Sequence, residues 1–67
     1  MTASHISAIR LIANRLVTEA TEARGVANTP GIGAAREHWL TKAEDFDEMA
    51  GSLRAIALTN DKNGGHA

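Results

Sequence analysis

Two short stretches of the chain hold residue types that could do chemistry. Residues 44–48 read EDFDE and supply four carboxylates within five positions. Paired carboxylates can act as general acid and base or hold a divalent cation. If this segment is helical, its inner positions are Phe46, Met49 and Ala50, so the carboxylates belong to the outer face. We therefore predict a solvated acidic face here, with no catalytic residue and no metal site.

The second stretch, TPGIGAAR at residues 29–36, holds the only proline and two of the six glycines. Phosphate-binding loops usually follow a strand and carry a lysine, whereas this stretch follows a helical pattern and has none. Thr29 is expected to cap a second helix that begins at Pro30, which makes the stretch the corner between two helices. The alternative is an anion-binding site at the start of that helix. Its candidate residues are Gly31, Gly33, Arg36 and Lys42.

Composition excludes several other kinds of site. The chain has no cysteine, so it can form neither a disulfide nor a thiolate zinc site. The three histidines, His5, His38 and His66, show no metal-ligand spacing. No nucleophile motif or nucleotide fingerprint is present, and we expect neither a cofactor nor enzymatic activity.

Charge and hydropathy bear on partners and location. Seven Lys and Arg against eight Asp and Glu give a net charge of −1, which weighs against nucleic-acid binding because phosphate contacts need a basic surplus. No apolar run reaches the length of a membrane span, and the N-terminus does not resemble a signal peptide. We expect a cytoplasmic protein with no membrane association.

Hydrophobic periodicity predicts the elements that must position these residues. Apolar side chains recur at helical spacing over residues 4–24, where Gly25 is a stop signal, and again over the second helix, residues 30–58. No segment alternates with the period of a strand. The predicted fold is all-α: an antiparallel two-helix hairpin forming a single domain over residues 1–60, followed by a disordered tail at 61–67.

The hairpin prediction also gives a pairing of the two helices. A fold about residue 27 brings apolar residues together as Leu16–Trp39, Ile12–Ala43, Ile9–Phe46 and Ile6–Met49. The second helix then extends beyond the first, and residues after about position 52 have no partner in their own chain. Large apolar residues remain unpaired in this scheme. They are Leu11, Leu40, Leu53, Ile56 and Leu58.

We predict that these five residues form an oligomer or partner interface, most simply in a homodimer that makes a four-helix bundle. The alternative is that these five residues are exposed to solvent and have no role in binding, because single exposed leucines are common on protein surfaces. Of the 29 apolar residues, 13 are alanines, which bury little area, so a lone hairpin would have a thin core.

The predicted hairpin and two segments of the sequence resemble two protein families. In shape, the hairpin is similar to the plasmid copy-number RNA-binding hairpin that dimerises into a four-helix bundle. Residues Trp39-Leu40 and Leu53-Arg54-Ala55-Ile56-Ala57 look similar to the second helix of phage-encoded hairpin proteins that sequester cyclic oligonucleotide signals in anti-defence. The second resemblance implies a ligand with phosphates in a pocket between subunits.

The function expected from all these features is that of a small non-enzymatic regulator, of the kind that phages or mobile elements encode, which self-associates and binds a partner protein. One alternative is a protein that sequesters a small anionic ligand such as a cyclic nucleotide at subunit boundaries. Another is a regulator that binds RNA or DNA.

Overall fold

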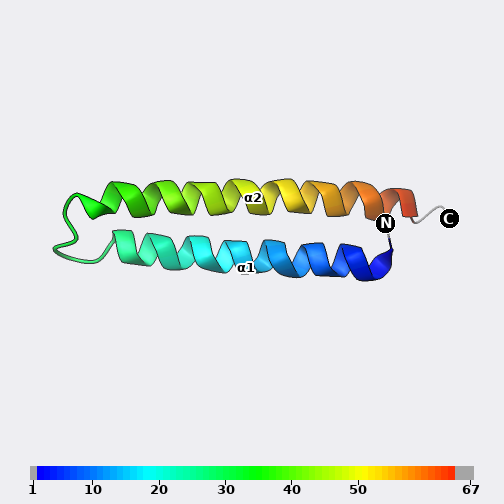
Figure 1. Ribbon diagram of the computed structural model, residues 1–67, viewed down its shortest axis with the longest axis horizontal. Helices are drawn as coiled ribbons and strands as arrows, with labels where there is room; N and C mark the ends of the chain where they lie inside the picture. Colours follow the sequence, from blue (N-terminus) through cyan, green and yellow to red (C-terminus); the bar gives the residue numbers. More distant parts are fainter. Residues whose placement is uncertain (1, 65–67) are drawn as a thin grey trace.

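Two long helices form an antiparallel hairpin in the computed structural model, which describes residues 2–64 (Figure 1). Helix α1 spans Ala3–Ala27 and helix α2 spans Ala35–Gly64, and no strand occurs in this part of the chain. The Cα atoms have a radius of gyration of 15.5 Å, against about 11 Å for a compact domain of this length. The predicted all-α hairpin is therefore confirmed, and it has the shape of a rod.

Helix α1 starts where the sequence suggests and ends later. The Thr2 side chain accepts a hydrogen bond from the backbone N–H of His5 at 3.2 Å and caps the first turn. Gly25 does not end the helix, which continues to Ala27. Instead of a glycine cap, the Asn28 N–H donates to the Arg24 carbonyl at 3.0 Å and the Thr29 N–H to the Val26 carbonyl at 3.0 Å.

The corner lies in the loop of residues 28–34 rather than in the first turn of α2. The Ile32 N–H donates to the Thr29 carbonyl at 3.3 Å, and Gly31 has a φ of 81°. Proline followed by a glycine with positive φ is the signature of a type II β-turn. The prediction that Thr29 caps a helix beginning at Pro30 is therefore wrong, because Gly31 and Gly33 turn the chain before α2 begins at Ala35.

The end of α2 also differs from the prediction. The helix continues to Gly64 and so includes the first four residues of the segment predicted to be a disordered tail. Residues 65–67 lie outside the described part of the chain.

Alanine dominates the core. Of the eight buried side chains among the described residues, seven are alanines and the other is Ile6. Ala13, Ala20 and Ala27 recur every seven residues in α1. Ala43, Ala50 and Ala57 do the same in α2. A strict spacing of seven is the pattern of a left-handed coiled coil, and small residues at the contact let the two helix axes come close.

Half-buried larger residues flank the alanines and fix the register. Trp39 and Phe46 pack against the buried cluster of Ala20, Ala23 and Ala43. Leu16 and Leu53 are half-buried at equivalent positions farther from the loop. In this register Ala20 packs with Ala43, whereas the predicted pairing placed Ile12 opposite Ala43. Each residue of α1 therefore faces a residue of α2 with a higher number than predicted.

Candidate interaction surface

The heptad spacing gives the hairpin two edges of different chemistry on either side of the alanine core. The apolar edge consists of Ile12, Leu16, Met49, Leu53 and Ile56. The polar edge consists of Arg10, Asn14, Arg24, Asp47 and Arg54. Ile12, Met49 and Ile56 each come one residue before a buried alanine of their helix. In an antiparallel pair of helices, residues at this heptad position of one helix lie beside those at the same position of the other. The apolar edge and the polar edge therefore lie on opposite sides of the alanine core.

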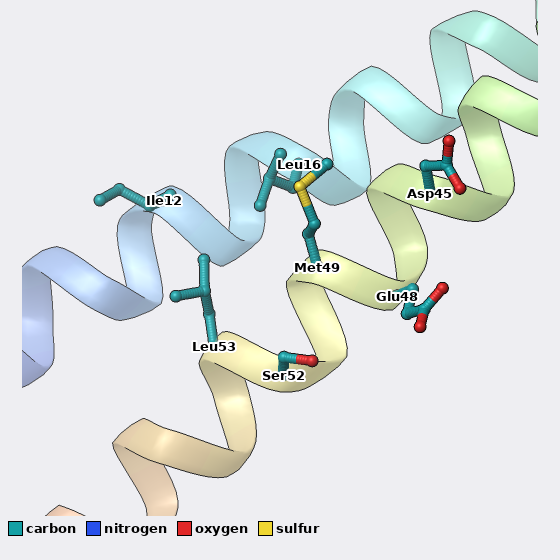
Figure 2. Close-up of a pocket in the computed structure, with 7 residues that line it drawn as sticks. All are labelled: Ile12, Leu16, Asp45, Glu48, Met49, Ser52 and Leu53. Atoms are coloured by element: carbon teal, nitrogen blue, oxygen red, sulfur yellow. The ribbon is translucent and has the colours of Figure 1, made fainter.

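A groove of about 790 Å³ runs along the apolar edge between the helices. Figure 2 shows Met49 of α2 reaching toward Leu16 of α1, with Leu53 beside Ile12. Ile12 is 53% exposed and Met49 is 45% exposed. Ile56, seven residues after Met49 and so on the same face of α2, is 44% exposed. This side of the hairpin therefore presents contiguous apolar surface to solvent.

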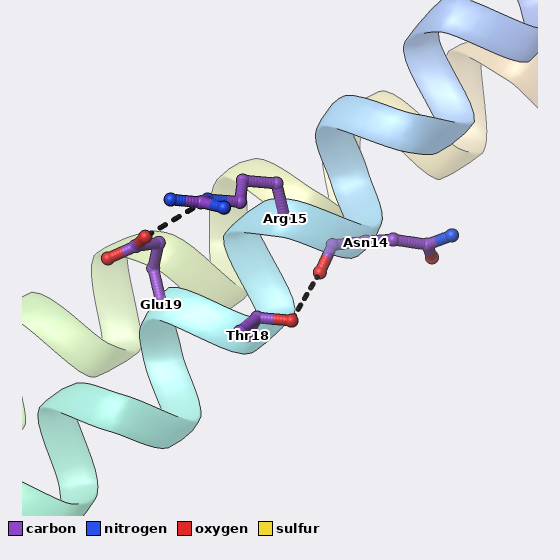
Figure 3. A network of polar contacts seen from close by, with 4 residues as sticks. All are labelled: Asn14, Arg15, Thr18 and Glu19. Atoms are coloured by element: carbon purple, nitrogen blue, oxygen red, sulfur yellow. Dashed lines mark hydrogen bonds and ion pairs between the residues drawn. The ribbon is translucent and has the colours of Figure 1, made fainter.

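The rim of this groove on α2 is acidic. Asp45, Glu48 and Ser52 line it, and their polar atoms point away from the apolar floor (Figure 2). On α1, Arg15 follows Ile12 by three residues and shares its side of the helix. Its Nε donates to Glu19 Oε1 at 3.1 Å, and in the same turns the Thr18 hydroxyl donates to the Asn14 carbonyl at 3.2 Å (Figure 3). The α1 rim thus carries the ion pair of Arg15 and Glu19, whereas the α2 rim carries the two carboxylates of Asp45 and Glu48.

The polar edge is held together by contacts between the helices. Arg24 and Asp47 form an ion pair in which both side chains are nearly half exposed. Arg54 donates from Nη2 to Asn14 Oδ1 at 3.1 Å. A smaller groove of about 360 Å³ lies here, lined by Arg10, Asn14, Arg54 and Leu58. Exposed ion pairs contribute only about 0–1 kcal/mol each to the free energy of unfolding. The main effect of these contacts is therefore to favour this register of the two helices.

The structure separates the five residues predicted to form one interface. Leu53 is half-buried facing α1, and Ile56 lies on the apolar edge. Leu58 lines the small groove of the polar edge, and Leu40 is half-buried on the same side of α2, seven residues before Asp47. Leu11 is 69% exposed on the outer face of α1. The proposed overhang after position 52 is wrong, because Ala57 is buried and Arg54 contacts Asn14.

The predicted anion-binding residues are not brought together either. Gly31 and Gly33 are exposed in the loop, where their positive φ angles serve the turn. The Lys42 ammonium lies 5.8 Å from the centre of the Trp39 ring, in a cation–π contact. Arg36 and Lys42 are six residues apart on α2, which places them about 120° apart around the helix axis. Neither the groove of the apolar edge nor that of the polar edge is lined by any of these four residues.

Residues 44–48 have the arrangement that the sequence suggests. Glu44, Asp45, Asp47 and Glu48 are exposed, whereas Phe46 is half-buried toward α1. Among the side chains that the structure describes, no group of three or more potential ligands is placed to hold a metal ion.

Sequence reasoning missed the apolar edge because it assigned Ile12 and Met49 to the core. In the structure, Ile12 lies beside Leu53 instead of Ala43, and Met49 lies beside Leu16 instead of Ile6. The signal that could have found the true register is the recurrence of alanine every seven residues in both helices. Aligning the two alanine series gives the core, and Ile12, Met49 and Ile56 then fall beside it.

Comparison of the chain with protein-family models, with curated proteins and with solved structures gives no match. Along the described residues, neither helix is both long and apolar enough to cross a membrane.

Proposed function

We propose that the protein is a small non-enzymatic interaction module, which self-associates through its apolar edge and binds a partner protein in a regulatory role. The observation that carries this proposal is the exposure of Ile12, Met49 and Ile56 on one side of the rod. Contiguous exposed apolar surface on a small protein often marks an interaction site. The polar edge stays outside the self-association contact and is the surface we propose for the partner protein.

The composition of the core supports self-association. Seven of the eight buried side chains are alanines, and each buried methyl group contributes only about 0.8 kcal/mol. Small domains without disulfides or metals usually need an additional source of stability, such as a second chain. Covering the apolar edge would bury the large side chains that the hairpin alone leaves half exposed.

The test is sedimentation equilibrium at micromolar concentration on the wild type and on a double variant, Met49→Glu with Ile56→Glu. We expect the wild type to be a dimer and the variant to shift to monomer, because two carboxylates would have to be desolvated in the contact. Circular dichroism on the same samples reports whether the variant remains helical.

A matched control replaces two equally apolar residues that lie off the apolar edge, Leu11→Glu with Leu58→Glu. These side chains are 69% and 66% exposed, so the control adds the same charge without touching the proposed contact. It should remain dimeric. A wild type that sediments as a monomer, or a control that dissociates as readily as the edge variant, would contradict the proposal.

A further inference from the structure

We infer that the smaller groove, on the polar edge beside Arg54, binds an acidic segment of a partner protein in which a carboxylate stands next to an apolar side chain. This inference rests on the proposed binding of a partner protein and specifies the chemistry of that partner. The groove lies across the alanine core from the apolar edge, so self-association through the apolar edge leaves it accessible.

Charge is distributed unevenly along the rod. The acidic half, residues 19–48, lies nearer the loop and holds seven acidic and three basic side chains, a formal charge of −4 with histidine neutral (Figure 1). The basic half consists of residues 2–18 and 49–64 and holds four basic side chains and one carboxylate, a formal charge of +3. The small net charge of the chain therefore conceals a basic end, and electrostatic complementarity directs an anionic partner to that end.

The smaller groove lies in the basic half, and no carboxylate lines it. Neither residues 2–18 nor residues 49–60 contain an acidic side chain. The nearest carboxylates of α2 in the sequence, Asp47 and Asp61, are each seven residues from Arg54, which is about 10 Å along the helix axis. The surroundings of Arg54 are therefore suited to a carboxylate supplied by another molecule.

Arg54 provides the hydrogen-bond donors for that carboxylate. Its Nη2 donates to the neutral Oδ1 of Asn14 at 3.1 Å, and no described carboxylate pairs with it. A guanidinium has five N–H donors in a planar fork and can bind a carboxylate through two parallel hydrogen bonds. Arg10 also lines the groove but is engaged in a contact of its own, so we assign the binding to Arg54.

Leu58 gives the same groove an apolar side. It follows Arg54 by four residues, so the two side chains lie on one face of α2. Leu58 is 66% exposed and lines the groove. A segment whose carboxylate binds Arg54 places a neighbouring apolar side chain against Leu58, and this contact removes apolar surface from water.

A nucleic acid is the competing anionic partner. Its affinity grows with the number of phosphates that basic side chains neutralise along the strand. The rod offers a basic surface only at one end, and a strand that followed the hairpin would pass along the acidic half. A short acidic segment of a protein engages the basic half without meeting the acidic one. The distribution of charge therefore favours a protein.

The test is an NMR titration of the intact chain with a short, terminally blocked peptide in which glutamate and leucine alternate. We expect saturable shifts of the Arg54 Nε–H and Asn14 side-chain amide resonances, with an affinity that falls as salt is added. Arg54→Gln should weaken peptide binding about tenfold or more, because it removes the charge but keeps an amide that can bond to Asn14. Circular dichroism reports whether the variant remains helical.

Two controls isolate the contribution of charge in the groove. Arg36→Gln removes an exposed arginine of α2 from the acidic half and should leave the affinity for the peptide unchanged. A second peptide, with glutamine in place of every glutamate, should bind about tenfold more weakly than the first. An oligothymidylate with the same number of charges as the acidic peptide tests the nucleic-acid alternative and should bind more weakly than that peptide.

The outcomes separate this inference from the proposed self-association. Absence of saturable binding, equal affinity of the wild type and Arg54→Gln, or equal affinity for the two peptides would overturn the inference. Tighter binding of the oligothymidylate would also overturn it and would identify a nucleic acid as the preferred partner. Each of these results leaves a dimeric wild type unaffected, whereas a monomeric wild type that binds the peptide through Arg54 would overturn self-association alone.

Discussion

Gly31 and Gly51 have the same side chain but opposite reasons to be glycine. Gly31 has a φ of 81°, which L-residues adopt only at a cost, and the turn after Pro30 depends on it. Gly51 lies inside α2 with helical backbone angles, and a Cβ built there meets nothing within 4 Å. From the sequence we could place Gly51 in a helix and Gly31 near a corner. The backbone angle that separates a required glycine from a replaceable one appears only in the fold.

We predict opposite effects for alanine at the two positions. Gly51→Ala should raise the free energy of unfolding by about 1 kcal/mol, because alanine is the better helix former and the site has room. Gly31→Ala should lower it by about 1–2 kcal/mol, because the left-handed conformation strains an L-residue. Urea denaturation of both variants beside the wild type measures each effect. Destabilisation by Gly51→Ala would mean that this face of α2 is covered in solution.

At the scale of the element, each helix is defined by its alanine series rather than by its large apolar residues. The sequence predicted both helices because periodic apolar residues are the strongest signal for an amphipathic helix. It misplaced their ends because Gly25 and Pro30 are ambiguous signals. Gly25 is tolerated within the last turn of α1, and Pro30 serves the β-turn instead of starting α2.

Packing at the alanine positions leads to a prediction about added volume. Ala50 is 1% exposed at the contact between the helices. Ala50→Leu should lower the free energy of unfolding by about 1–3 kcal/mol, because the larger side chain forces the helices apart. Ala55→Leu, at an exposed position of the same helix, is the control and should change stability by less than about 0.5 kcal/mol. Thermal denaturation compares the two, and equal stability would show that α2 does not pack through Ala50.

For the whole molecule, the sequence predicted the hairpin but not the pairing of its helices. In an antiparallel hairpin, moving the centre by one residue changes the residue that faces a given position by two residues along the other helix. Placing the corner at residue 27 instead of within residues 28–34 therefore shifted Leu16 from Met49 to Trp39. The apolar composition was compatible with either register, because both helices are rich in alanine. Only the register in the structure separates the apolar edge from the polar edge.

The position of Trp39 beside the short loop has a consequence for how the chain folds. Trp39 packs on the alanine cluster close to the loop, so this contact closes a short segment, whereas contacts near Ile6 and Ala57 close nearly the whole chain. Closing a longer segment costs more chain entropy. We expect the hairpin to form from the loop outward and to open from its far end. Amide hydrogen exchange should show protection decreasing steadily from residues 20–23 and 39–46 toward the ends, and uniform protection would instead indicate that the rod opens as one unit.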